Sequence, residues 1–222
     1  MGNFSLETFI YGLAVGAIPV LFAITLHEVA HGWAANKLGD STAKMLGRLS
    51  LNPIRHVDPI GTVAIPAFLL LMGSPFLFGW AKPVPVNFRN LRNYRRDMIL
   101  VAAAGPAANF IMASFWMLVL GIIYVMAGGT PVGDGFVKMA SVGVTINLLL
   151  MVFNLLPIPP LDGGRVLSGL APPNISSTLD RIEPFGFMIV IALMVSGILW
   201  QIIDPVINAL TTLLQTVFLF WL

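Results

Sequence analysis

The chain has 222 residues, of which 57% are hydrophobic and only 10% are charged. So little charge excludes an ordinary soluble domain and indicates an integral membrane protein in contact with the lipid bilayer. The net charge of +2 is too small to indicate a nucleic-acid partner, and the absence of cysteine excludes a disulfide framework and a thiolate metal site. Any zinc ion must therefore be bound by histidine and carboxylate side chains.

The first predicted membrane span, residues 6–36, carries a His-Glu-x-x-His motif near its end. His27 and His31 are four residues apart, so on a helix both imidazoles project from one face and can share one Zn²⁺ ion. Glu28 takes the position at which zinc hydrolases hold the carboxylate that accepts a proton from the attacking water. The alternative is a pair of interfacial histidines with a helix-capping glutamate. Polar side chains within a span are costly unless they have a function, which favours the metal site.

Two further features of this span concern its packing. Gly12 and Gly16 form a G-x-x-x-G pair, which permits two helices to approach closely, so we expect the pair to pack against another helix of the protein. Pro19 is expected to kink the span ahead of the motif.

The third histidine, His56, lies in the polar and basic segment 37–59. One interpretation is that His56 assists the metal ligands or binds substrate. The alternative is that it makes a local hydrogen bond within its loop.

Residues 60–80 are apolar, but basic residues gather on both sides of them, in 37–59 and in 80–97. A crossing segment would put these two basic loops on opposite faces of the membrane, against the positive-inside rule. We therefore predict that 60–80 is re-entrant. All basic residues except Lys138 then lie on the cytoplasmic side, where the ends of the spans that carry His31 and Asp162 also meet.

Residues 81–87 show the alternation of an extended edge strand, and we predict a short membrane-embedded β-hairpin there. Prolines prevent pairing on one side, whereas the other edge could pair with an unwound substrate by strand addition. The alternative is an ordinary structured loop. The candidate substrate-binding residues are Lys82, Pro83, Val84, Pro85 and Val86.

The sequence as a whole predicts an all-α polytopic membrane protein with about five transmembrane helices, the re-entrant segment and the short β-hairpin. We predict one domain over residues 1–222, with a core at 6–170 and a C-terminal helical hairpin at 185–222 that is split by Asp204-Pro205. The spans after the first are expected at 97–127, 137–156, 185–203 and 206–222.

The span at 137–156 ends in a proline-rich break followed by Asp162 and two glycines. An irregular backbone at membrane depth is tolerated only inside protein or beside a cavity. Asp162 could supply the third zinc ligand and leave the fourth position to water, and Asn154 could donate a hydrogen bond to a developing oxyanion. The alternatives are a turn or N-cap role for Asp162 and an interhelical hydrogen bond for Asn154.

The His-Glu-x-x-His motif, followed far downstream by Asn154-x-x-Pro157-x-x-x-x-Asp162-Gly163, resembles the site-2 protease family (M50) of intramembrane zinc metalloproteases. Residues 51–61, 79–87 and 105–109 also resemble its compact prokaryotic branch, so the likeness covers roughly residues 20–170. The connections leave no room for a PDZ domain and do not suggest a CBS domain.

This resemblance implies one zinc ion per chain, with His27, His31 and Asp162 as its ligands. It also implies Glu28 as general base, Asn154 as a supporting residue near the scissile peptide, and a strand around 81–86 that aligns the substrate.

The function that we predict is an intramembrane zinc endopeptidase that cleaves transmembrane segments of other membrane proteins, as in regulated intramembrane proteolysis. We expect it in a prokaryotic cytoplasmic (inner) membrane with its active site towards the cytoplasm. The alternatives are a zinc protease acting on prenylated or soluble C-termini, a catalytically silent membrane-protein-binding homologue and a metal transporter. A transporter should carry charged residues or histidines in several spans, and a silent homologue should lack Glu28 or Asp162.

Overall fold

The computed structural model describes residues 6–72 and 79–220. Within these ranges the chain is all-helical, as the sequence predicts, and it contains no β-strand. In chain order the elements are α1 (Leu6–Leu38), α2 (Thr42–Met45), η1 (Pro53–His56), η2 (Pro59–Ala64), α3 (Ile65–Leu71), η3 (Phe88–Asn90), α4 (Tyr94–Ala127), α5 (Pro131–Asn154), α6 (Asp162–Leu170), α7 (Pro173–Val195) and α8 (Ile198–Phe218).

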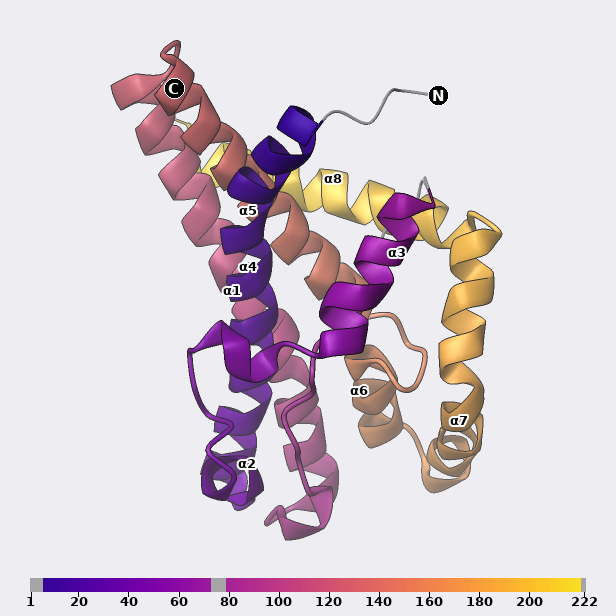
Figure 1. Cartoon of the computed structure of the whole chain (residues 1–222). Helices are drawn as coiled ribbons and strands as arrows, with labels where there is room; N and C mark the ends of the chain where they lie inside the picture. The colour runs from indigo at the N-terminus through magenta and orange to yellow at the C-terminus, as the bar shows by residue number, and fades with distance from the viewer. Residues whose placement is uncertain (1–5, 73–78, 221–222) are drawn as a thin grey trace.

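Three long helices, α1, α4 and α5, pack together into a bundle (Figure 1). Helix α4 packs against both α1 and α5, and α1 also contacts α5. All three are apolar and long enough to cross a bilayer, because even 24 residues extend about 36 Å at 1.5 Å per residue. Small and apolar side chains fill the contact between α4 and α5, among them Ala113, Met117, Val144 and Leu148.

The C-terminal region differs from the predicted hairpin of two spans. Helices α7 and α8 meet at an angle of 80° (Figure 1). The break lies at Gly197, whose φ of +77° is a left-handed conformation that ends α7 at little steric cost. Asp204 and Pro205 lie inside α8 instead. The expected five spans are therefore not supported: the described residues hold three candidate spans, or up to four if the bent pair counts as one.

The segment between α2 and α4 turns back on itself. Its helical part, η2 and α3, has 6 and 7 residues, or about 20 Å, which is too short to cross the hydrocarbon core. The Trp80 N–H donates to the carbonyl of Gly61 at 3.1 Å, and the Thr62 hydroxyl donates to the carbonyl of Trp80 at 2.8 Å. The two ends of 60–80 thus lie at the same level, as a re-entrant segment requires, although residues 73–78 lie outside the described residues.

The predicted β-hairpin at 81–87 is not supported, because this stretch has no regular secondary structure in the part of the chain that the structure describes. Its two prolines have no N–H group and cannot continue a ladder. Two of the other N–H groups bond outside the stretch: that of Lys82 to the carbonyl of His56 at 2.9 Å, and that of Val84 to Glu28 Oε2 at 2.6 Å. The stretch is a structured loop, the alternative considered from the sequence.

Candidate metal centre and active site

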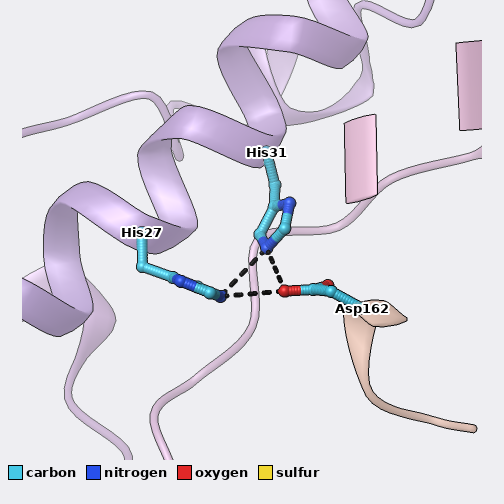
Figure 2. Close-up of side chains that lie close together, drawn as sticks. All are labelled: His27, His31 and Asp162. Atoms are coloured by element: carbon cyan, nitrogen blue, oxygen red, sulfur yellow. Dashed lines mark hydrogen bonds and ion pairs between the residues drawn. The ribbon is translucent and has the colours of Figure 1, made fainter. Parts of the chain in front are cut away.

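Two helices bring together three side chains that could bind a metal ion (Figure 2). His27 and His31 project from one face of α1, and Asp162 is the first residue of α6. The two Nε2 atoms lie 3.0 Å apart, and each lies 3.3 Å from Asp162 Oδ2. Ligand atoms of a tetrahedral zinc ion are roughly 3.3 Å apart, given bonds of about 2.0–2.2 Å. These three atoms therefore have the spacing of three zinc ligands.

The hydrogen-bond partner of Nδ1 in each imidazole determines whether Nε2 carries a proton or a lone pair. His27 Nδ1 lies 2.6 Å from Asn109 Oδ1, and His31 Nδ1 lies 2.7 Å from the carbonyl oxygen of Val101. Both partners are acceptors, so each Nδ1 carries the proton and each neutral imidazole turns the lone pair of Nε2 towards Asp162.

Three lone pairs thus converge on one point, and the arrangement calls for a cation. Asp162 Oδ2 is buried and has no hydrogen-bond partner among the described residues. Two imidazoles and one carboxylate form a donor set that suits Zn²⁺ and leaves a fourth position open.

The backbone around Asp162 explains its orientation. The N-cap residue of α6 is Leu161, and Asp162 follows it as the first helical residue, so the N-cap alternative does not apply. A Cβ on Gly163 would collide with the carbonyl oxygen of Leu155, so the absence of a side chain there permits the tight return of the chain from α5. This return brings Asp162 to the histidines of α1.

A buried hydrogen-bond network, which the sequence reasoning missed, orients His27. Asn109 in α4 donates from Nδ2 to the carbonyl of Ala23 at 3.2 Å and to Asn147 Oδ1 at 2.9 Å. Asn147 in turn donates to the carbonyl of Gly143 at 2.8 Å, and both asparagines are fully buried. An asparagine inside an apolar span was the available signal, because buried polar groups in a membrane are usually paired and functional.

Gly105 allows α4 to approach His27 and His31 closely. A Cβ at this position would lie 2.6 Å from His31 Cε1 and 2.7 Å from His27 Cε1. Any side chain on Gly105 would therefore displace the imidazoles.

Glu28 lines a cavity of about 290 Å³ together with the three metal-binding residues. Its Oε2 atom accepts the Val84 N–H at 2.6 Å. Asn154, in the last turn of α5, lines the same cavity and donates from Nδ2 to the carbonyl of Leu150 within its own helix at 2.9 Å. The cavity thus combines the two motifs that the sequence separates by more than a hundred residues.

Only some of the predicted substrate-binding residues line the cavity. Pro83, Val84 and Val86 line the cavity, whereas Lys82 and Pro85 do not. Arg48 anchors residues 82–83 through two hydrogen bonds, in which Nη2 donates to the carbonyls of Lys82 at 2.9 Å and Pro83 at 3.3 Å.

His56 does not line the cavity. Its side chain is buried, and Nε2 donates to the carbonyl of Ser50 at 2.8 Å, while its own carbonyl accepts the Lys82 N–H at 2.9 Å. The structure thus places His56 in the support of the loop, as in the local interpretation.

Arg165 is a further cavity residue that the sequence reasoning did not select. Its guanidinium carbon lies 4.8 Å from the centre of the Phe88 ring, and Nη2 lies 3.4 Å from Glu183 Oε1. Among the residues that line the cavity, Arg165 is the one with a permanent positive charge.

Comparison with known proteins identifies similar sequences. A family model described as peptidase family M50 matches residues 119–197, which include Asn154 and Asp162. YwhC of Bacillus subtilis is 41% identical over 194 residues, which cover 86% of this chain and 85% of YwhC. Rip2 of Mycolicibacterium smegmatis is 29% identical over 79% of this chain and 64% of Rip2. The names of both relatives describe zinc metalloproteases.

A more distant relative is the regulator of sigma-E protease RseP of Escherichia coli, which is 29% identical over 57% of this chain and 29% of RseP. The chain therefore spans most of YwhC but less than a third of RseP. No solved structure gave a significant match.

Proposed function

The chain belongs to peptidase family M50 and is an intramembrane zinc metalloprotease, in which we propose that His27, His31 and Asp162 bind the single zinc ion. The observation that carries this assignment is the convergence of two imidazole lone pairs and one unpartnered carboxylate oxygen within 3.3 Å. When bound, zinc supplies a Lewis acid that polarises the scissile carbonyl and lowers the pKa of the attacking water.

Glu28 is the general base of the proposal. Its Oε2 atom is held by the Val84 N–H, which leaves Oε1 to take the proton of the attacking water and to deliver it to the leaving amine. A carboxylate that is fixed in this way need not reorganise during the reaction.

Asn154 and the 82–86 loop are proposed to hold the substrate. One N–H of the Asn154 amide is used within α5, and the second is available for the developing oxyanion or the substrate backbone. The loop supports this role because Pro83, Val84 and Val86 line the cavity beside Glu28. Arg48 and His56 are proposed to act only through the loop, which they hold in place.

The substrates are proposed to be transmembrane segments of other membrane proteins. Such a segment must unwind before cleavage, because helical peptide bonds are hydrogen-bonded and shielded by side chains. His31 lies seven residues before the end of α1, or about 10 Å along the helix. A site at this depth is reached more readily by an unwound segment than by an intact helix.

The protein is an integral membrane protein, and we place it in a prokaryotic cytoplasmic membrane with the active site towards the cytoplasm. The basic loops 37–59 and 80–97 contact each other and the site, since Arg48 donates to the carbonyl of Lys82 and the Val84 N–H donates to Glu28, which supports this orientation. Helix α1 carries Lys37 in its last turn, where a lysine reaches the headgroups.

Zinc content and proteolysis of the purified protein test the proposal. We expect one zinc per chain in the wild type by elemental analysis, marked loss in Asp162→Ala, and full retention in the control Asp134→Ala, which changes an exposed acid at the far end of α5. Zinc retained in Asp162→Ala, or none in a wild type purified without chelators, would overturn the ligand assignment. Cleavage of a spanning peptide in proteoliposomes should stop with a chelator and return with added Zn²⁺.

A further inference from the structure

A second, larger cavity lies beside the catalytic one. It is an apolar groove of about 740 Å³ between α1, α5, the re-entrant segment and the α7–α8 pair. Gly12 and Gly16 line the groove from α1, and Leu150 lines it from α5. Trp80 lines it from the re-entrant segment and Trp200 from α8.

The G-x-x-x-G pair faces this groove rather than another helix of the protein. A Cβ built on either Gly12 or Gly16 meets no atom within 4 Å among the described residues. The internal packing expected from the sequence is therefore not observed. A G-x-x-x-G face permits the close approach of a second membrane helix. Among the described residues, no helix occupies that position beside Gly12 and Gly16.

The groove adjoins the catalytic cavity along α1 and α5. In α1, Ile24 lines the groove and His27, less than one turn further on, lines the cavity. In α5, Phe153 lines the groove and the next residue, Asn154, lines the cavity. A helix lying in the groove would thus point one end towards the metal centre.

We propose that this groove docks the transmembrane helix of the substrate while it is still helical, with a small-residue face against Gly12 and Gly16. The proposal rests on the proposed function, since it specifies how a spanning substrate reaches that site.

A second copy of the chain fits the groove less well. In a two-fold symmetric dimer formed through Gly12 and Gly16, the groove of one copy would face the groove of the other copy. Neither groove would then be filled. A substrate helix is convex and fills the recess with its own side chains.

Cysteine cross-linking tests the docking directly, because the chain contains no cysteine of its own. Gly16→Cys is compared with Ala14→Cys, an exposed position on α1 that does not line the groove. Both are made with Glu28→Gln so that the substrate stays intact. The probe is a synthetic single-span peptide of about 20 apolar residues with one G-x-x-x-G pair and one cysteine, in proteoliposomes.

We expect the peptide to cross-link to Gly16→Cys at least about tenfold more than to Ala14→Cys, which corresponds to about 1.4 kcal/mol of preference. Equal yields at the two positions, no cross-link at Gly16→Cys, or cross-links only between two copies of the chain would each overturn the proposal. A lack of cross-linking would mean that lipid fills the groove. The measurement requires neither zinc nor cleavage, so it can fail while the metalloprotease assignment stands.

A groove-filling variant gives the matching activity test. Gly16→Leu is tolerated in the folded protein because open space surrounds its Cβ. We expect roughly tenfold lower kcat/KM for the spanning peptide, with unchanged zinc content and unchanged cleavage of a short unstructured peptide. The control Ala14→Leu should cleave both peptides like the wild type. Wild-type cleavage of the spanning peptide by Gly16→Leu, or equal loss for both peptides, would contradict docking in the groove.

Discussion

Asn109 Oδ1 lies 2.6 Å from His27 Nδ1, although the two residues are 82 positions apart in the chain. This bond fixes the tautomer of His27 and thereby turns the lone pair of Nε2 towards His31 and Asp162. Because Asn109 also bonds Asn147, the orientation of a metal ligand on α1 depends on both α4 and α5.

The first prediction concerns this bond. Asn109→Ala removes the acceptor of His27 Nδ1, and zinc affinity should fall about 10- to 100-fold, the usual effect of losing such a partner. Asn109→Asp keeps an oxygen opposite Nδ1 and should restore most of the affinity. Competition with a chelator of known affinity measures the effect. Wild-type affinity in Asn109→Ala would show that the bond does not orient the ligand.

The second prediction separates catalysis from metal binding. Glu28→Gln keeps an oxygen that can accept the Val84 N–H but cannot act as a base. Cleavage of the spanning peptide should fall by about 10²- to 10⁴-fold while the zinc content stays at the wild-type level. Substantial turnover by this variant would remove Glu28 from the proposed mechanism, whereas parallel loss of zinc would make it a structural residue of the site.

The third prediction uses the close approach of α4 to the histidines. Gly105→Ala places a Cβ 2.6 Å from His31 Cε1, so the imidazoles must shift and the zinc content should fall. Alanine is the better helix former, so this loss is not expected to come from weaker helix formation. Gly135→Ala is the matched control, since a Cβ there meets nothing within 4 Å. Equal zinc in both variants would contradict this geometry.

The fourth prediction concerns pH and the loop that follows α1. Asp40 is buried and accepts hydrogen bonds from Thr42 Oγ1, the Asn87 N–H and Asn90 Nδ2. Burial raises the pKa of Asp40, but these hydrogen bonds outweigh burial and lower it below the ordinary value. The folded state therefore favours the ionised form, and the resulting stability is present above the unfolded pKa of about 4 and is lost as the pH falls through the folded pKa.

Asp40→Asn should accordingly destabilise the protein by about 1–3 kcal/mol at pH 7. Thermal unfolding in detergent measures this difference at neutral pH and again below about pH 4, where it should shrink. The exposed Asp134→Asn should change little at either pH. A difference that grows on acidification would show the opposite sign of linkage.

The fifth prediction tests the topology with single cysteines. Lys44→Cys and Arg89→Cys flank the re-entrant segment at exposed positions, and Val132 is 71% exposed at the start of α5. An impermeant thiol reagent applied to intact cells should spare the first two positions and label Val132→Cys. Labelling of Lys44→Cys and Arg89→Cys from opposite faces would show that 60–80 crosses the membrane.

Local patterns were sufficient for part of the fold. The return of 60–80 could be predicted because charge distribution limits which loops share a face of the membrane. The C-terminal break was placed incorrectly, because a proline within a helix does not always end it, whereas Gly197 ends α7 through a left-handed φ of +77° that the sequence does not reveal. Likewise, the β-hairpin predicted at 81–87 was wrong, because the alternating pattern did not reveal that the Val84 N–H would bond Glu28 instead of a neighbouring strand.

The sequence by itself determined that this is a membrane protein and that His27 and His31 share one helix face, because composition and helical period are local properties. It also indicated Asp162 as a third ligand, through the irregular backbone that precedes it. Only the tertiary structure decided that Asn109 and Val101 orient the histidines, that Gly105 makes room for them and that Gly12 and Gly16 face an open groove. Those relationships depend on the relative rotation and depth of packed helices, which no local pattern encodes.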